Sequence, residues 1–516
     1  MLRTTFTRVT FLALTTVSLL AFGSFISQVQ SATSEPHAND DPVVIDGEFN
    51  SVDWSSMVGQ QVIIKGELVV VDTYDLARHG QVKVARRRLY IPTNTIDPND
   101  KDPDGTSFEG GNNVAKVVEA QKLNDKATIM LDDGLSAQNI FPPKLFPNLG
   151  KAYPSIRVGS GITAVSGTLT KAGDNIVLVP SSPFRFTPAK RPQRPDVGKA
   201  DVTVASFNVL NYFTTIDDGR NKARGANNES EFKRQEAKLV SAILGLEADV
   251  IGLMELENNL ESESQLVAAL NKELGKNAFK GCGIPDGFRA APGGSNAIRV
   301  GIIYRTDRID PVGSVAMIND SAFSKARTPV VHSFKSKTGG TPFTLIVNHF
   351  KSKGGSREAD VVNKNKGDGQ GAFNAARRAQ SLAICKFIDA RKQVDAEPRV
   401  LVIGDLNAYK QEDPIDVMRA NELVNLHEQA GSDHSSDSEA QDYSYVYYGQ
   451  SGSLDHAMAS SALAADVTGI AVWHINADEP RFLDYNEEFK PKTLYKANPF
   501  RSSDHDPVLI GIRTRH

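Results

Sequence analysis

Short runs of β-branched and aliphatic residues recur through residues 197–516, and most of them stop at a polar side chain. Examples are VASFNVLNY, VIGLMELEN, TLIVNHFKSK and VLVIGDLNAY. Runs of this length are typical of buried strands. Between them lie segments with helical spacing of apolar residues, such as EFKRQEAKLVSAILGLEAD. Strands that alternate with helices predict an α/β fold in which helices cover the sheets.

The polar residues that end these runs are carboxylates, amides and imidazoles: Asn208, Glu255, His349, Asp405, Asn407, Asp455, Asp504 and His505. A single aspartate after a strand is ordinary turn chemistry. Six fragments of this kind indicate a shared site, because an α/β sheet presents its ligand-binding groups at strand ends. Carboxylate and amide oxygens suit a hard divalent cation, and two histidines suit proton transfer near neutral pH. This chemistry favours metal-assisted phosphodiester hydrolysis.

Two strings are specific enough to indicate a family, GDLN (404–407) and SDHDP (503–507). In this order they resemble the endonuclease/exonuclease/phosphatase superfamily, over about residues 197–516. GDGQGAFNAAR (367–377) and WHINADEP (473–480) are similar to signatures of its secreted bacterial extracellular nucleases. The resemblance implies a four-layered α/β sandwich, in which two mixed β-sheets are flanked by helices and the active site lies at one open edge.

The resemblance also implies roles for the polar residues. The ligands of a Mg²⁺ or Mn²⁺ ion would be Asn208, Glu255, Asp405 and Asp504. His505 would be the base, oriented by Asp455, and His349 would act on the leaving 3′ oxygen or its phosphate. Asn407 would donate to a phosphate oxygen, and Asp405 would also count among the catalytic residues.

Four further residues are predicted to contact phosphate or DNA, namely Lys351, Lys353, Asn374 and Arg377. For the last two, helix-face solvation and capping are an equal alternative. The chain departs from several relatives at Asn296, where they carry an acidic residue that supports the second histidine. An amide there orients an imidazole but stabilises its charge less well.

Residues 1–32 have the pattern of a secretory signal peptide. Arg3 and Arg8 precede the apolar stretch 11–26, and cleavage is expected after Ser31 or Ala32. An uncleaved anchor is the alternative. The mature protein is therefore expected outside the membrane, secreted and monomeric. The formal net charge of −4 argues against a passive binder of polyanions.

Residues 43–187 alternate short β-rich runs with Gly, Asn and Asp turns, which predicts a small all-β domain. One predicted hairpin has its turn at Lys171–Asn175. The assignment of an OB-like barrel rests on the resemblance. Arg86, Arg87, Arg88 and Tyr90 suit either a nucleic-acid groove or a charged edge strand.

The string DPNDKDPDG places Asp100, Asp102 and Asp104 like the first half of a loop for an auxiliary Ca²⁺ ion. Gly111 stands where such a loop needs its glutamate. Proline-rich residues 188–197 are predicted to be a solvated linker, followed by the catalytic domain at 198–516. Cys282 and Cys385 suit either one disulfide or two separate thiols.

Together these patterns predict a secreted, metal-dependent endonuclease that hydrolyses extracellular DNA with little sequence specificity and leaves 5′-phosphates. RNA is an alternative substrate. A different phosphoesterase of the same superfamily, such as a sphingomyelinase or a phosphatase, is the second hypothesis. A non-catalytic nucleic-acid-binding protein is the third.

Overall fold

The computed structural model describes residues 41–430, except 103, 356 and 358, and residues 442–515. The chain divides into two compact units, 1–41 and 42–516, and the second holds the helices and strands described below. The predicted signal peptide (1–32) lies outside the described residues. None of the described helices is long and apolar enough to span a bilayer.

Two six-stranded mixed sheets form the centre of the region 198–516. In the first sheet the strand order is β13 (Phe279–Gly281), β14 (Ile298–Arg305), β12 (Val250–Glu257), β11 (Val202–Tyr212), β24 (Val508–Ile512) and β23 (Val467–Val472). In the second it is β15 (Ile309–Met317), β16 (Val330–Ser336), β17 (Phe343–His349), β18 (Val400–Asp405), β22 (Asp455–Ser460) and β19 (Leu423–Asn425). The pairs β11–β12 and β17–β18 are parallel, and the other pairs in these sheets are antiparallel.

The two sheets pack face to face around a core of aliphatic side chains. Val204 and Val250 of the first sheet share one buried cluster with Val347 and Ile403 of the second. The sheets approach closely at Gly252, where an added Cβ would lie 2.7 Å from Ile403 Cδ1. A larger residue at this position would therefore push the sheets apart.

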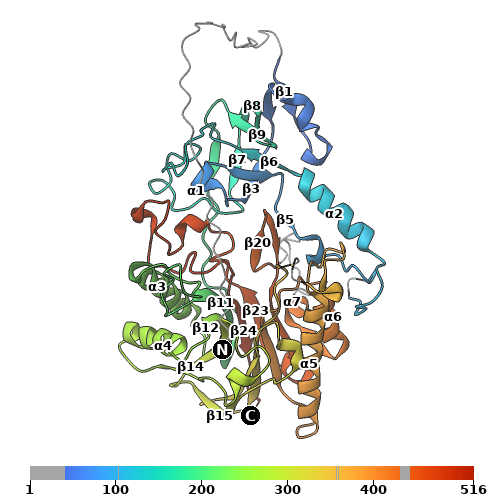
Figure 1. Ribbon diagram of the computed structural model, residues 1–516, viewed down its shortest axis with the longest axis vertical. Coiled ribbons are helices and arrows are strands. Elements are labelled where there is room, and N and C mark those ends of the chain that lie inside the picture. Colours follow the sequence, from blue (N-terminus) through green and yellow to red (C-terminus); the bar gives the residue numbers. More distant parts are fainter. Residues whose placement is uncertain (1–40, 103, 356, 358, 431–441, 516) are drawn as a thin grey trace, which may run out of the picture. The chain divides into compact units, whose positions relative to one another are not determined.

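Helices cover both outer faces, as Figure 1 shows with α3 and α4 on one side and α5 and α6 on the other. The bounds are α3 (Glu229–Leu246), α4 (Glu261–Leu274), α5 (Asn374–Lys392), α6 (Asp413–Ala420), α7 (Leu426–Ala430) and α8 (Ser461–Ala464). Leu239 of α3 packs on the first sheet, and Ile384 of α5 packs on the second. The predicted four-layered α/β arrangement is therefore present in the described residues.

The region 43–187 is built mainly from a nine-stranded sheet. The order is β1 (Val43–Ile45), β2 (Gln61–Ile64), β8 (Val165–Ala172), β9 (Asn175–Pro180), β6 (Thr128–Leu131), β4 (Val82–Ala85), β3 (Leu68–Asp72), β7 (Gly161–Thr163) and β10 (Arg185–Thr187). The antiparallel pair β8–β9 confirms the predicted hairpin. The OB-like closure and the domain boundaries stay predictions.

This region is not purely β, because it also contains α1 (Leu76–His79) and α2 (Val114–Lys126). Helix α2 was not predicted from the sequence, since only Val117 of this helix is buried and its apolar face is weak. Asp100 Oδ1 and Asp102 Oδ1, in the loop before α2, accept hydrogen bonds from backbone amides of that same loop. A Ca²⁺ ion at this loop stays a prediction.

The β-rich region is joined to the rest of the second unit by strand pairing and buried ion pairs. Strand β5 (Leu89–Tyr90) pairs with β21 (Gln450–Gly452), which forms a hairpin with β20 (Tyr445–Tyr447). Arg88 Nη1 lies 3.0 Å from Asp478 Oδ1, so the charge of Arg88 is paired within the protein. Arg191, in the predicted linker, pairs with buried Glu479 at 2.9 Å. The segment 188–197 is thus anchored rather than fully solvated.

Both cysteine thiols are free. Cys385 lies on α5 in the apolar cluster beneath the second sheet, while Cys282 is partly buried beside the first. The separate-thiol interpretation is therefore the correct one. Burial raises the pKa of both thiols, so neither is set up as a nucleophile.

Asp416 on α6 is buried without a hydrogen bond to either carboxylate oxygen. Its ion pair with Arg419 is 3.4 Å long, and burial together with the charge of Asp97 raises its pKa to about 9. A raised folded-state pKa means that this group costs increasing stability as pH rises from about 4 towards 9.

Replacing Asp416 with Asn is expected to raise the melting temperature at pH 8, by about 1 °C for each kcal/mol relieved, because the unfolding entropy scales with the size of the unit. At pH 4 to 5 the difference in melting temperature between the variant and wild type should be smaller. Thermal unfolding of both proteins across this pH range checks the prediction. A variant that is less stable at pH 8 would mean that ionised Asp416 is a stabilising partner.

Candidate active site

The predicted site residues converge where the strands of both sheets end. Asp405, at the end of β18, lies at the centre of this group. Its Oδ2 atom is 3.4 Å from Asn208 Nδ2, 3.3 Å from His349 Nε2 and 3.9 Å from His505 Nε2. Burial alone would raise the pKa of Asp405, but the hydrogen bond with His349 and the charges of both histidines bring it below its usual range.

Local irregularities in the first sheet aim Asn208 and Glu255 at this point. The β11–β12 register shifts after Asn208, and the β12–β14 register shifts between Leu253 and Leu256. Glu255 has φ +68°, a left-handed conformation that is rare for a residue other than glycine. Its Oε2 accepts the Asn211 amide at 2.8 Å, and its Oε1 lies 3.3 Å from Asn208 Nδ2. Strain of this kind typically persists at functional sites.

His505 and Asp455 form a buried pair. His505 Nδ1 donates to Asp455 Oδ2 at 2.7 Å, and Ser444 Oγ donates to the same carboxylate oxygen. Burial alone would lower the pKa of His505, but the charge and hydrogen bond of Asp455 raise it well above its usual value. With the Nδ1 proton held by Asp455, Nε2 of His505 faces the site and can accept a proton when the imidazole is neutral, a state that the raised pKa moves to higher pH.

His349, on the other side of Asp405, has a different environment. Arg327 Nη2 lies 2.5 Å from His349 Nε2, and Arg327 Nη1 donates to the Phe350 carbonyl. Burial and the charge of Arg327 lower the pKa of His349. Asn296 does not support His349 as predicted, because its amide donates to the Ala326 carbonyl at 3.2 Å. It fixes the loop that carries Arg327 instead.

The residues predicted to contact phosphate differ from one another in their partners and in their exposure. Asn407, with φ +48°, donates to the Phe350 carbonyl, and Asn374 donates to Asp413 at 2.8 Å. Lys351 lies partly exposed with Nζ 4.1 Å from the centre of the Phe373 ring.

The side chains of Lys353 and Arg377 form hydrogen bonds within the protein. Lys353 Nζ donates to Glu412 Oε1 at 2.6 Å. Arg377 is fully buried and donates to the carbonyls of Ala372 and Gln370 at 2.7 Å. The prediction of direct phosphate contact does not fit these two residues, because their donors already hold the GDGQGAFNAAR loop beside α5. They position the loop that carries Lys351.

The WHINADEP signature has a similar positioning role. Asn476 Nδ2 donates to the His505 carbonyl at 2.7 Å, and Asn476 Oδ1 accepts the backbone amides of Ser502 and Ser503. Asp506 Oδ1 accepts the Asn476 amide in return. This network holds the SDHDP loop and therefore fixes His505 against Asp455.

The profile of the Endonuclease/Exonuclease/phosphatase family matches residues 205–505, a range that includes Asn208, Glu255, His349, Asp405, Asp455 and His505. The chain belongs to this family. Enzymes of the endonuclease/exonuclease/phosphatase family are hydrolases that act on phosphoester bonds, and nucleases are among them. Their chemistry agrees with the grouping of Glu255, Asp405 and His505 at one sheet edge.

Several solved structures are similar to this chain at low sequence identity. A mannosyl-6-phosphatase of Bacteroides thetaiotaomicron is 16% identical, with a TM-score of 0.39 over 60% of this chain and 99% of that chain. The human Nocturnin catalytic domain is 15% identical, with a TM-score of 0.39 over 62% and 97%. Truncated TDP2 of Caenorhabditis elegans is 15% identical, with a TM-score of 0.35 over 60% and 97%. A comparison with curated proteins found no match.

Endonuclease/exonuclease/phosphatase enzymes generally use a divalent metal such as Mg²⁺. Glu255 and Asp405 bring hard carboxylate oxygens to this point, which suits that ion, and Asn208 turns its Nδ2 towards both carboxylates. Among the described residues, no group of three or more His, Cys, Asp or Glu side chains is closed around one point that could hold a metal. A site with few protein ligands still fits Mg²⁺, because this ion keeps several of its waters.

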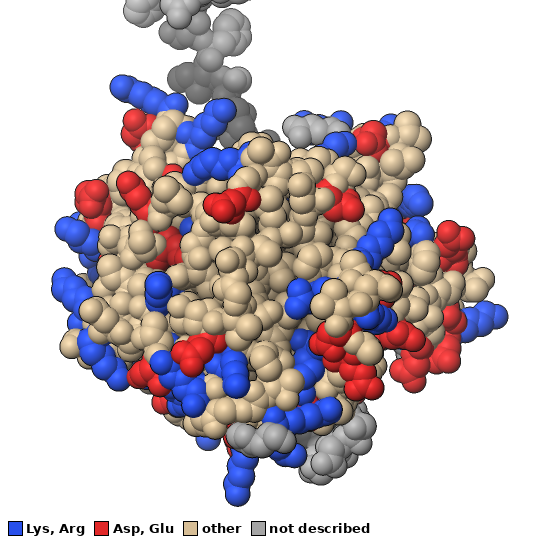
Figure 2. All heavy atoms as spheres, turned by 90° about the horizontal axis from the view of Figure 1, so that it is seen from below, with Lys and Arg blue, Asp and Glu red and all other residues tan. Residues whose placement is uncertain are grey.

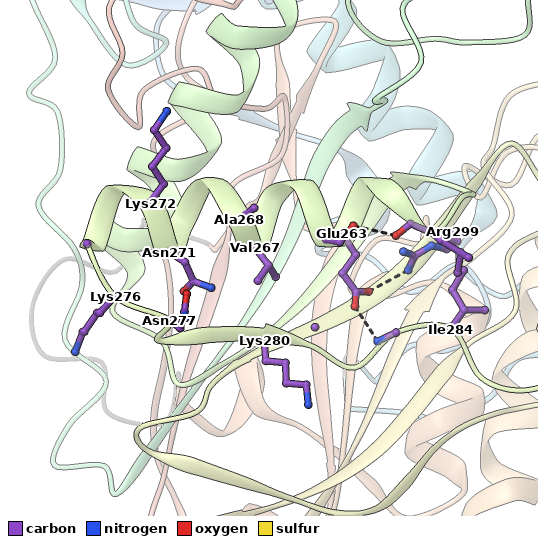
Figure 3. Close-up of a pocket in the computed structure, with 15 residues that line it drawn as sticks. Glu263, Val267, Ala268, Asn271, Lys272, Lys276, Asn277, Lys280, Ile284 and Arg299 are labelled. Atoms are coloured by element: carbon purple, nitrogen blue, oxygen red, sulfur yellow. Dashed lines mark hydrogen bonds and ion pairs between the residues drawn. The ribbon is translucent and has the colours of Figure 1, made fainter.

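A groove beside α4 is separate from the family site (Figure 3). It has a volume of about 830 Å³ and is lined by residues such as Val267, Asn271 and Lys280. At one end Glu263 forms a buried ion pair with Arg299 at 3.1 Å. None of the predicted catalytic or metal-binding residues lines this groove.

Proposed function

We propose that this chain is a secreted, divalent-metal-dependent nuclease that hydrolyses extracellular DNA with little sequence specificity. The single observation that carries the proposal is the Asp455–His505 pair, whose Nε2 atom faces Asp405 beside the oxygen-rich donor set. We further propose internal cleavage that leaves 5′-phosphates. Secretion is supported by the signal-peptide pattern of residues 1–32.

The chemistry assigned to the chain's own residues follows from their geometry. His505 Nε2 accepts the proton of the attacking water, while Asp455 holds the proton on Nδ1 and stabilises the imidazolium that forms. His349 is assigned to orient the phosphate or the leaving 3′ oxygen. Arg327 contacts His349 Nε2, favours the neutral imidazole and adds positive charge where the phosphate charge increases.

Glu255, Asp405, Asp504 and Asn208 would hold the metal, which when bound supplies Lewis-acid stabilisation of the phosphate oxygens. Asn407 is assigned to donate to one of those oxygens. A polymeric substrate is favoured over a small phosphate ester because Asp504 lines a cavity of about 1040 Å³ that extends to Tyr74 and Lys83 of the β-rich region.

A panel of three substrates tests this function. Purified protein is incubated with supercoiled plasmid DNA, with sphingomyelin vesicles and with a chromogenic phosphomonoester, each with Mg²⁺ or with excess EDTA. We expect Mg²⁺-dependent cleavage of the plasmid and much slower turnover of the other two substrates. Faster hydrolysis of sphingomyelin or of the phosphomonoester than of DNA would replace the nuclease with another phosphoesterase.

A further inference from the structure

A hairpin beside the catalytic histidine carries a group of tyrosines that the chemistry above does not use. Strand β20 contributes Tyr445 and Tyr447, and Tyr448 follows at the turn before β21. All three line the cavity of about 1040 Å³ that also contains Asp504 and Asn211. The hairpin therefore lies between the proposed metal ligands and the β-rich region.

The tyrosines extend outwards from the site. The ring of half-buried Tyr445 lies 4.6 Å from that of His505, at an interplanar angle of 34°. Tyr447 is on the same face of the strand, two residues further. It is 52% exposed, and Tyr448, whose ring centre is 4.5 Å away, is 70% exposed. Across the cavity lining, Tyr74 is 64% exposed with Arg481 over its ring.

The hairpin is held firmly, although its tip is exposed. Strand β21 pairs with β20 on one side and with β5 of the β-rich region on the other. Tyr448 and Gly449 have φ +49° and +82°, the geometry of a type I′ turn, in which Asn or Gly is the usual first central residue. The Tyr448 ring contacts Tyr447 but stays mostly in solvent despite the backbone strain at this position, so a ligand is the partner that would bury it.

The charges in the cavity do not provide a basic track for duplex DNA. Its lining includes Lys83, Arg224, Arg481 and Arg501 together with Asp72, Asp75, Asp125 and Asp174. In the face that Figure 2 shows, Lys and Arg side chains are likewise interspersed with Asp and Glu. Tight binding of duplex backbone depends on neutralising many phosphates. Stacking on aromatic rings needs no net positive charge, but it needs bases that are free of their own partners.

From these observations we propose that Tyr447 and Tyr448 form a stacking platform for unpaired nucleobases, so that single-stranded nucleic acid is the preferred substrate. Tyr445 continues the platform to His505, which places the stacked segment next to the scissile phosphate. This inference rests on the proposed nuclease function. It adds a preference for single-stranded over double-stranded substrate, and it names the residues that cause this preference.

Binding of a fluorescein-labelled oligothymidylate in EDTA tests the platform without cleavage. We expect the Tyr447→Ala/Tyr448→Ala double variant to bind at least about tenfold more weakly, since stacking contributes ~1–3 kcal/mol per base. Alanine, like tyrosine, has a Cβ atom and is strained at the positive φ of position 448, so the substitution leaves the backbone strain unchanged. The Tyr447→Phe/Tyr448→Phe variant should bind like wild type, and so should Phe489→Ala, which removes a 74% exposed ring outside the cavity.

Cleavage assays separate this inference from the function on which it rests. The double alanine variant should lose kcat/KM on the single-stranded oligonucleotide but hydrolyse bis(p-nitrophenyl) phosphate, a diester without nucleobases, at the wild-type rate. Unchanged oligonucleotide binding by the double variant, or an equal loss in Phe489→Ala, would overturn the platform and leave the nuclease intact. A wild-type protein that cleaves the small diester but no nucleic acid would overturn both.

Discussion

The His505→Ala enzyme is expected to hydrolyse DNA about 10²–10⁴-fold more slowly than wild type, because positioned acid–base catalysis contributes that much. His505 Nε2 is the acceptor that the 2.7 Å bond to Asp455 leaves available. Initial rates on supercoiled plasmid at saturating Mg²⁺ measure the effect. Binding of Mn²⁺ should survive, since the imidazole is not in the proposed ligand set.

Asp455→Asn is the matched partner of this variant. The amide keeps a contact with His505 Nδ1 but selects the wrong tautomer and stabilises the imidazolium less. We expect a large loss that is still smaller than that of His505→Ala. A His505→Ala rate within about tenfold of wild type would mean that the water is activated without this imidazole.

Glu255→Gln is expected to lower kcat by at least about a thousandfold, because several kcal/mol of charge stabilisation depend on the bound metal. Glutamine is close in size, and its side-chain oxygen can still accept the Asn211 amide, so the strained backbone at position 255 keeps a partner. The loss should therefore reflect metal binding and not the fold.

Raising the Mn²⁺ concentration provides the control for Glu255→Gln. A weakened site should recover part of the lost rate as the ion becomes saturating, and the melting temperature without metal should match wild type. Wild-type activity in this variant at low Mg²⁺ would contradict the placement of the metal.

The convergence of the catalytic residues could be predicted from the sequence because it follows from strand direction. Asn208, Glu255, His349 and Asp405 each follow or end an apolar run, and β11–β12 and β17–β18 are parallel. Their carboxyl ends must then meet at common edges. The covering of buried strands by helices could be predicted from the alternating patterns, whereas the two facing sheets of the four-layered arrangement were implied by the family resemblance.

The roles of the lysine and arginine side chains could not be predicted from strand direction. Lys353 and Arg377 look like phosphate ligands in the sequence, but Glu412 and the carbonyls of the 370–372 loop already hold them. Arg327 was missed because it lies in a loop before β16 and ends no apolar run. Only the fold brings its guanidinium to His349.

The position of the tyrosine hairpin could not be predicted from the sequence either. The string YSYVYYGQ reads as a short strand near a turn, and nothing in it indicates a neighbour in residues 43–187. Its position depends on the pairing of β21 with β5, between residues far apart in the chain. Buried Arg157 with Glu479 joins the same two regions, and this too required the fold.

The most direct test of metal-dependent hydrolysis at the Asp405-centred site is a plasmid-nicking time course. Wild type and Glu255→Gln are each incubated with supercoiled DNA in Mg²⁺, in excess EDTA, and in EDTA followed by excess Mg²⁺. We predict that wild type produces nicked and linear DNA in Mg²⁺, stops in EDTA and recovers when Mg²⁺ is restored, while the variant stays inactive in Mg²⁺. Equal cleavage by wild type in EDTA and in Mg²⁺, or an unimpaired variant, would contradict the proposed site.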